Sequence, residues 1–163
     1  MFVTVGNGRE PFRRLLEPVD RLAGEGLFAP AEVLVQSGND GGFRATHCRQ
    51  VPFMPMRDFA ATVSQATLVI AHAGAGTLFH LLQSGQVPVI MPRRRAFAEC
   101  VDDHQLELAE ALARQGRVVA AMTAEDLPAA VAAARQRTGR PGAGSPPRML
   151  GLVEQAITDL MSR

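Results

Sequence analysis

The stretch Leu68-Val69-Ile70-Ala71-His72-Ala73-Gly74-Ala75-Gly76-Thr77 decides the fold of this chain. Its first four residues form a continuous apolar run, which is typical of a strand covered on both faces of a parallel sheet. Small residues then predict a tight turn, and the segment from Gly74 to Ser84 has a helical pattern that ends at Gly85, a natural C-cap. A buried strand that turns directly into a helix is the building unit of an α/β protein.

The same alternation of strand and helix signals extends along most of the chain. We expect strands over residues 2–5, 32–36, 47–53, 68–71, 87–91 and 118–120. We expect helices from Pro11, from Asp58 as a cap, over 74–84, from Asp102 or Asp103 to Gly116, and over 125–135. Strands and helices that alternate across short turns predict a doubly wound parallel sheet.

The alternation divides the chain into three parts. Residues 1–137 form one domain, and residues 138–147 are a linker rich in Gly and Pro. Residues 148–163 predict an amphipathic helix with an apolar stripe that runs from Met149 to Leu160. This stripe either packs on the sheet of its own domain or binds a partner from a flexible tether.

Composition excludes several classes of function. The chain has 163 residues, enough for one domain, and all 17 basic residues are Arg. Without Lys there is no P-loop and no Schiff-base chemistry, and without Tyr there is no Tyr–Lys proton donor. A net charge of +1 argues against a nucleic-acid binder. Cys48 and Cys100 form no metal-ligand pattern, and no signal peptide or membrane span is expected, so we predict a cytoplasmic protein.

The turn after the buried strand carries the first candidate site. Ligands bind at the carboxyl ends of the strands in doubly wound folds, and a helix that begins there offers free amides to a diphosphate. Gly74, Gly76 and the Thr77 hydroxyl fit this role, with His72 facing the same crevice. The alternative is an ordinary tight turn in which His72 is bonded locally.

Two further segments follow the next strand and belong to the same edge of the sheet. Arg93, Arg94 and Arg95 can neutralise phosphates, although an ordinary solvated loop explains them as well. The run from Asp102 to Gln105 opens a helix, and His104 and Gln105 suit sugar hydroxyls. Adjacent carboxylates lack the Asp-x-Asp spacing of many sugar transferases, so we expect no metal.

Taken together in this order, the motifs resemble the C-terminal, donor-binding half of family 28 glycosyltransferases. The resemblance rests on 72–77, Gln83-Ser84-Gly85-Gln86-Val87-Pro88-Val89, Pro92-Arg93 and Asp103-His104-Gln105, with the opening Val3-Thr4-Val5-Gly6 before Phe12. It covers roughly residues 1–135 and is strongest toward short soluble subunits of split transferases. These include the subunit of the dolichol-linked N-acetylglucosamine transferase and small subunits of bacterial exopolysaccharide transferases.

The resemblance implies a Rossmann-like domain that is the C-terminal half of a GT-B transferase, an inverting mechanism without an obligatory metal, and a UDP-sugar substrate with no cofactor. The implied site residues are Gly74, Gly76, Thr77 and Arg93 for the donor diphosphate, His80, Glu99, His104 and Gln105 for the donor sugar or ribose, and Gly6 and Asn7 in the cleft loop. Residues 1–137 would then be the UDP-sugar-binding domain.

One position departs from the family pattern. Larger members carry an acidic residue that holds the ribose hydroxyls where this chain has His80. An imidazole can bond a diol without a full negative charge, but a helix residue with no ligand role explains His80 equally well. The family's general base usually lies in the other half of the cleft, so His72 is the local catalytic candidate, as a base or as a group that stabilises the leaving diphosphate.

These features support a hexosyltransferase subunit that is inactive alone. It would pair with a membrane-associated partner that binds a polyprenyl-diphosphate-linked acceptor, and would lie peripherally at the inner face of the membrane. The alternative is a nucleotide-sugar-binding module that regulates or scaffolds an assembly complex, and a fragment of a sugar-nucleotide epimerase is a third possibility. The sequence leaves glucuronic acid, galactose and N-acetylglucosamine open as the transferred sugar.

Overall fold

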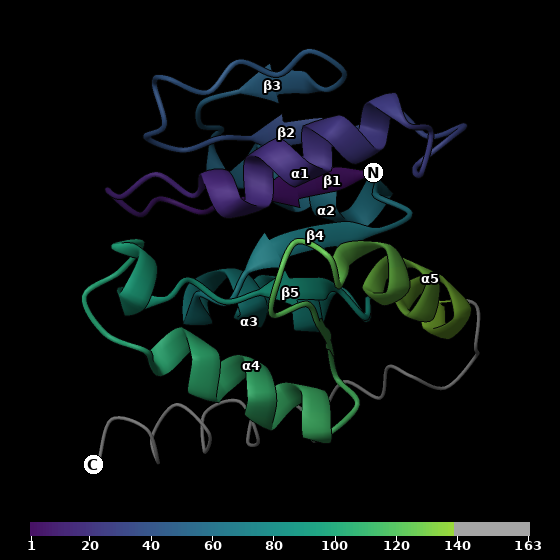
Figure 1. Cartoon of the computed structure of the whole chain (residues 1–163). Coiled ribbons are helices and arrows are strands. Elements are labelled where there is room, and N and C mark those ends of the chain that lie inside the picture. Colours follow the sequence, from purple (N-terminus) through teal and green to yellow (C-terminus); the bar gives the residue numbers. More distant parts are fainter. Residues whose placement is uncertain (139–163) are drawn as a thin grey trace.

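Six short strands form one parallel sheet in the computed structural model, which describes residues 1–138 (Figure 1). The strands are β1 (Phe2–Thr4), β2 (Leu34–Gln36), β3 (Arg49–Val51), β4 (Val69–His72), β5 (Val89–Met91) and β6 (Val119–Ala120). Their order across the sheet is β3-β2-β1-β4-β5-β6, and every neighbouring pair runs parallel. The predicted doubly wound, Rossmann-like sheet is confirmed.

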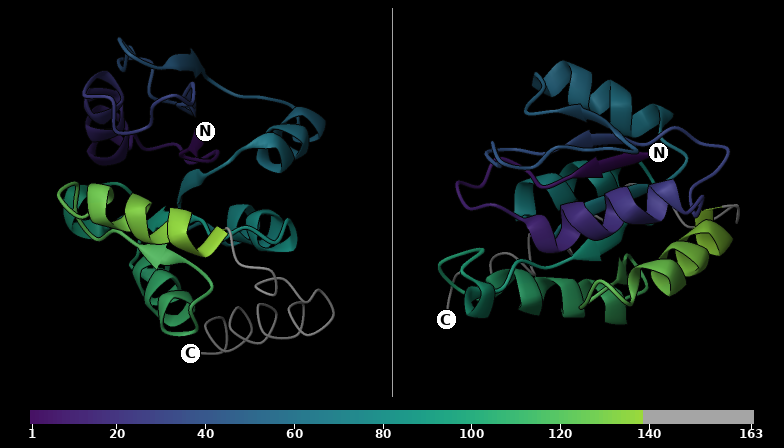
Figure 2. Two further views of the ribbon diagram at one scale, coloured as in Figure 1. Left: turned by 90° about the vertical axis from the view of Figure 1, so that its right-hand side faces the viewer. Right: turned by 45° about the horizontal axis from the view of Figure 1, so that its top comes forward.

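Helices cover both faces of this sheet. They are α1 (Arg13–Gly24), α2 (Met56–Gln65), α3 (Ala75–Gln83), α4 (His104–Arg114) and α5 (Leu127–Thr138), with a short 3₁₀ helix η1 (Arg95–Phe97) after β5. Helices α1 and α5 share one apolar core with the sheet, and α2, α3 and α4 share the other. The left view of Figure 2 shows α1 and α2 on opposite sides of the strands.

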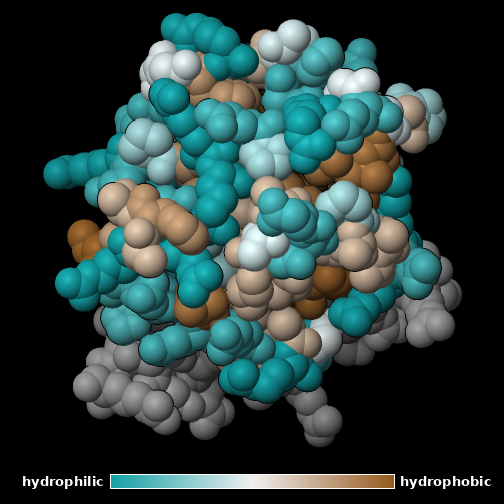
Figure 3. Space-filling view, viewed as in Figure 1, coloured by the Kyte–Doolittle hydropathy of each residue, from teal (hydrophilic) through white to brown (hydrophobic). Residues whose placement is uncertain are grey.

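Alternate residues of the central strands β1, β4 and β5 pack into the two cores. Val3 and Ile70 pack toward α1 and α5, whereas Phe2 and Val69 pack toward α2 and α3. All four side chains are fully buried. This pattern explains the continuous apolar runs in the sequence, because a central parallel strand is covered on both faces. In Figure 3 hydrophilic side chains gather over α1, and the surface is more apolar toward the alanine-rich α5.

Several boundaries differ from the predicted ones. Helix α2 begins at Met56 with Pro55 at its N-cap, so Asp58 lies in the first turn and does not cap the helix. A proline fits this position because the first helical amides need no intrahelical partner. The 3₁₀ turn η1 carries no sequence signal that predicted it. Helix α5 continues to Thr138, beyond the expected end near Arg135.

Gly85 does what its sequence position predicts. Helix α3 ends at Gln83, and Gly85 follows with a φ of +75° and an amide that donates to the carbonyl of Leu82 at 3.2 Å. Glycine adopts this left-handed conformation without steric cost. The predicted linker over 138–147 and the helix over 148–163 lie outside the described residues, except for Thr138 at the end of α5. The three-part division of the chain therefore stays a prediction.

Candidate functional site

A cavity of about 520 Å³ opens at the carboxyl edge of the sheet, between the loops that follow β1 and β4. The chain leaves these neighbouring strands in opposite directions, because β2 lies on one side of the pair and β5 on the other. Such a switch point is where doubly wound folds bind ligands. The lining residues are Thr4, Gly6, Asn7, Gly8, Gln36, Met54, Met56, Phe59, His72, Gly74, Ala75, Gly76, Thr77 and His80.

The N-terminus of α3 supplies unpartnered donors to this cavity. Gly74 is the N-cap, and the first intrahelical bond runs from the Leu78 amide to the Gly74 carbonyl at 2.9 Å. The amides of Ala75, Gly76 and Thr77 precede that bond, and no side chain of the described residues caps them. These three N–H groups and the positive end of the helix dipole are suited to an anion.

His72 ends β4 and lies between two glycines. A Cβ atom on Gly6 or on Gly74 would collide with the imidazole, so both turns approach the ring more closely than any side chain permits. Gly6 also has a φ of +69°, a second reason for glycine at that position. His72 is only 8% exposed, and its Nδ1 has no hydrogen-bond partner among the described residues.

The surroundings keep His72 neutral. Burial lowers the pKa of His72 to about 4, and the positive charge of Arg93 adds to this effect, while the backbone of Thr4 opposes it. A neutral imidazole has one N–H donor and one acceptor nitrogen. At pH 7 His72 can therefore donate one hydrogen bond, and its unprotonated nitrogen is too weakly basic to take up a proton readily.

A short hydrogen-bonded chain forms the floor of the cavity. The Thr4 hydroxyl donates to Oε1 of Gln36 at 2.8 Å and accepts the Gly6 amide at 3.1 Å. Thr4 and Gln36 are both buried. Asn39 adds a second link, since its Nδ2 donates to the carbonyl of Gly8 at 2.8 Å. The turn after β1 is thus fixed to the neighbouring strand before any ligand binds.

Arg93 does not face the cavity. Its side chain is buried, and its guanidinium donates to the carbonyls of Val5, Glu10 and Glu99 at 3.1, 2.8 and 3.0 Å. It also lies over the ring of Phe12, 4.7 Å from the centroid. These contacts join the loop after β5 to the loop after β1. This buried position does not favour the predicted contact of Arg93 with a diphosphate. Arg93 instead holds the loop after β5 against the loop after β1.

The Glu99 carboxylate, like the Arg93 guanidinium, is occupied by contacts within the protein. Its carboxylate forms a two-pronged ion pair with Arg14, at 3.0 Å from Nε and 2.8 Å from NH2, and accepts the Arg94 amide at 3.0 Å. Arg14 also donates to the carbonyls of Pro92 and Met122. Sequence reasoning missed Arg14, because nothing in its local pattern distinguishes it from a solvated helix residue. The predicted contact of Glu99 with sugar or ribose is not favoured by this arrangement.

His104 and Gln105 begin α4 outside the cavity lining. The His104 side chain is 65% exposed and lies near Asp102, and the Oε1 of Gln105 accepts the Arg93 amide at 3.2 Å. The described structure therefore gathers His72, Gly74, Gly76, Thr77, His80, Gly6 and Asn7 in one cavity lining and leaves Arg93, Glu99, His104 and Gln105 outside it.

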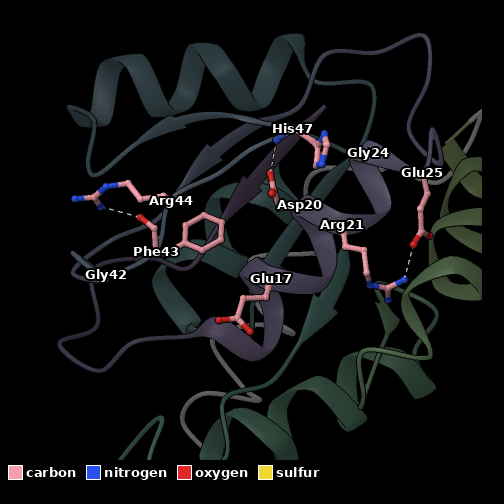
Figure 4. Close-up of a pocket in the computed structure, with 9 residues that line it drawn as sticks. All are labelled: Glu17, Asp20, Arg21, Gly24, Glu25, Gly42, Phe43, Arg44 and His47. Carbon is pink, nitrogen blue, oxygen red and sulfur yellow. Dashed lines mark hydrogen bonds and ion pairs between the residues drawn. The ribbon is translucent and has the colours of Figure 1, made fainter.

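A second hollow, of about 620 Å³, lies between α1 and the connection from β2 to β3 (Figure 4). Its polar groups largely satisfy one another: Arg21 pairs with Glu25 at 2.7 Å, and the Asp20 carboxylate accepts the His47 amide at 2.9 Å. Arg44 donates to the carbonyl of Phe43 at 2.9 Å. Although larger, this hollow lies away from the switch point, and none of the described residues that line it offers unpartnered helix amides like those at the start of α3.

Residues 1–138 contain no helix suited to a membrane and no cluster of side chains suited to a metal ion. No helix there combines the length and apolar character that crossing a membrane requires. In the same residues His, Cys, Asp and Glu side chains form no group of three or more that could hold a metal ion. The metal-independent mechanism stays a prediction.

Comparison with known proteins gives one family match and several relatives. The model of the glycosyltransferase family 28 C-terminal domain matches residues 1–145. The chain is 33% identical to a UDP-N-acetylglucosamine transferase subunit ALG13 of Yarrowia lipolytica, over 71% of this chain and 61% of that protein. It is 39% identical to a UDP-N-acetylglucosamine–N-acetylmuramyl-(pentapeptide) pyrophosphoryl-undecaprenol N-acetylglucosamine transferase of Ralstonia nicotianae, over 46% of this chain and 19% of that protein.

Solved structures show the same fold. The crystal structure of Acinetobacter baumannii MurG superposes with a TM-score of 0.61 at 24% identity, over 96% of this chain and 49% of that one. A glycotransferase of kitacinnamycin superposes with a TM-score of 0.55 at 19% identity, over 39% of its length. The chain thus spans about half or less of these structures and less than two thirds of the curated relatives named above.

The two glycines of the α3 turn should respond differently to alanine. Gly74→Ala should destabilise the fold by about 1–3 kcal/mol, because its Cβ meets the His72 ring. Gly76→Ala meets open space inside a helix and should be neutral or stabilising by up to about 1 kcal/mol. Urea unfolding measures both. In a His72→Ala background the cost of Gly74→Ala should vanish, and a cost that persists there would contradict the steric explanation.

His72 should make stability depend on pH. Its folded-state pKa of about 4 lies below the ordinary value of about 6.5, so the unfolded chain takes up the proton first. The stability of the protein relative to His72→Gln should therefore be constant above pH 7. It should fall by up to about 3 kcal/mol as the pH drops from 6.5 to 4. Urea unfolding of both proteins across this range measures the difference, and a difference that does not change with pH would contradict a buried neutral imidazole.

Proposed function

Because this chain belongs to the family of the glycosyltransferase family 28 C-terminal domain, as its sequence motifs predict, we propose that it is the donor-binding half of a glycosyltransferase. Its donor would be a UDP-sugar, a proposal supported by relatives whose names state UDP-N-acetylglucosamine transfer. The acceptor would be a lipid-diphosphate-linked glycan bound by a separate subunit, in the assembly of an exopolysaccharide or related glycan.

One observation carries the proposal: the unpartnered amides of Ala75, Gly76 and Thr77 meet the buried, neutral His72 in a single cavity. A nucleoside diphosphate carries its charge on oxygens that accept hydrogen bonds. Helix amides bind such oxygens without a desolvation cost comparable to that of a buried side-chain charge. Gly76 is open on its Cβ side, so a phosphate can approach the backbone closely there.

The proposed reaction is a single displacement at the anomeric carbon of the donor sugar. The acceptor hydroxyl oxygen forms a bond to that carbon, the bond from the carbon to the diphosphate oxygen breaks, and the hydroxyl proton goes to a base. Negative charge develops on the departing diphosphate. The α3 amides and the N–H of neutral His72 would stabilise that charge, so His72 assists the leaving group in this proposal and is not the base.

The carboxyl edge of the sheet has features of a surface that another subunit covers. The exposed large apolar side chains of the described residues all lie there: Phe53 and Met56 after β3, and Phe97 and Val101 after β5, the last two 54% and 81% exposed. Exposed apolar side chains around a polar cavity are typical of interaction sites. A membrane-associated partner at this edge would hold the chain peripherally at the inner face of the membrane.

A second candidate function follows from what the cavity lacks. Among the described residues that line it, none carries a carboxylate, and His72 is a weak base. A nucleotide-sugar-binding module that regulates or scaffolds an assembly complex would need no base. The two functions differ in whether adding the second subunit yields sugar transfer.

Donor binding should depend on the charge at the α3 N-terminus. Gly76→Asp should weaken UDP binding at least about tenfold, because a carboxylate would replace open space beside the diphosphate. Gly76→Asn, which is similar in size and uncharged, should retain most of the affinity. Gly41→Asp adds the same charge outside the cavity, also into open space, and should have no effect. Isothermal titration with UDP measures the series, and equal affinities for Gly76→Asp and the unaltered chain would place the diphosphate elsewhere.

Transfer should require a second chain. We expect the purified protein to bind at least one of UDP-glucuronic acid, UDP-galactose and UDP-N-acetylglucosamine without transferring it. Membranes that contain the acceptor-binding subunit and its lipid-diphosphate acceptor should restore transfer, measured with radiolabelled donor, and Gly76→Asp should abolish the gain. Binding without transfer in the presence of the partner would favour the regulatory module. Equal transfer rates with and without the partner would contradict the split enzyme.

A further inference from the structure

The lining of the cavity combines two groups of residues of unlike character, and we call each group an arm of the cavity. One arm is formed by the turn after β1, with Gly6, Asn7 and Gly8. The other runs between α3 and the segment that leads into α2, and its wall is Met54, Met56, Phe59 and His80. A nucleoside diphosphate sugar anchored by its phosphates must place the sugar in one arm and the nucleoside in the other. The apolar arm suits a nucleobase, because thioether and aromatic groups contact flat rings favourably.

The apolar arm is partly open before a ligand binds. Met56 is 60% exposed, whereas Phe59, three residues further along α2, is buried. An exposed methionine at the mouth of a cavity can adapt its flexible side chain to an apolar group of the ligand. A methyl group on the nucleobase would find additional apolar contact on this wall.

His80 is the polar member of the same wall. Its ring stands edge-on to Phe59 and Phe79, with centroids 6.3 and 5.8 Å away. The side chain is partly exposed and makes no hydrogen bond to another described residue. Water can therefore satisfy the imidazole whenever the ligand does not.

We expect this wall to discriminate weakly between ribose and 2′-deoxyribose. Strong discrimination by a missing hydroxyl arises when its absence leaves a buried polar group unpaired. Here the described lining contains no carboxylate to grip a diol, and the partly exposed His80 stays hydrated when a hydroxyl is missing. Loss of the 2′-hydroxyl should thus change affinity little, while a methyl group at C5 of the pyrimidine should add apolar contact at Met56.

We infer that the cavity accepts 2′-deoxythymidine diphosphate and its sugars as well as UDP and its sugars, with His80 and Met56 setting the choice of nucleoside. This inference rests on the proposed function, because it assigns the nucleoside selected by the same cavity.

Three nucleotides separate the two contributions in isothermal titrations of the full chain. UDP and 2′-deoxy-UDP differ only in the hydroxyl, and we expect their dissociation constants to agree within about threefold. 2′-deoxy-UDP and 2′-deoxy-TDP differ only in the methyl group, and we expect the second to bind about threefold tighter, as burial of one methyl implies.

Variants of the two wall residues assign the effects. His80→Glu should create a preference for UDP over 2′-deoxy-UDP of about tenfold or more, since a carboxylate bonds a diol strongly. His80→Gln, polar but uncharged, should keep the ratio of the unaltered chain. Met56→Ala should remove the advantage of the methyl group and leave the UDP to 2′-deoxy-UDP ratio unchanged. Each comparison is a ratio within one variant, so a general loss of affinity does not affect it.

The outcomes distinguish this inference from the proposed function. If UDP binds and both deoxynucleotides bind more than tenfold more weakly, the nucleoside assignment is wrong while donor binding stands. If Met56→Ala leaves the methyl advantage intact, the base lies elsewhere and the assignment is also wrong. If none of the three nucleotides binds, the proposed function itself fails.

Discussion

The candidate site depends on the packing of the His72 imidazole against backbone at Gly6 and Gly74. The ring brings together two turns that are 68 residues apart in sequence and that leave neighbouring strands in opposite directions. Because no side chain fits at either glycine, both turns pack their backbone directly against the ring. The first-turn amides of α3 then lie at the mouth of the crevice, next to a buried imidazole that burial keeps neutral.

Arginine organises the loops around this contact. Arg93 and Arg14 reach carbonyls and a carboxylate on segments far apart in the chain, and each joins the loop after β5 to the segment after β1. A guanidinium can do this because its donors lie in one rigid plane and point in several directions, which the compact ammonium of lysine cannot match. Both guanidinium groups already bind other parts of the protein. The groups left to bind a ligand in the described cavity are therefore helix amides and a neutral imidazole.

Local pattern predicts the parts of the site that backbone geometry fixes. The apolar run before His72, the glycines at 74 and 76 and the turn at Gly6 each carry a sequence signal, because strand burial and close backbone approach restrict residue type. The roles of Arg93 and Glu99 carry no such signal. Both follow β5 as expected, but η1 and the left-handed Ala98, with a φ of +54°, set the path of that loop. Their partners lie about 80 residues away, on the segment around α1.

The geometry of the proposed displacement explains why the described cavity looks incomplete. In an inverting transfer the acceptor oxygen approaches the anomeric carbon on the side opposite to the leaving diphosphate. A diphosphate held on the α3 amides therefore directs the acceptor, and the base beside it, away from α3 and beyond the carboxyl edge of this sheet. Groups that stabilise the negative leaving diphosphate are therefore needed on the α3 side of the anomeric carbon, and a negatively charged base is needed on the opposite side. A cavity with helix amides, a neutral His72 and no carboxylate in its described lining is what one half of such a site requires, and the apolar side chains at the same edge suit a second subunit that brings the other half.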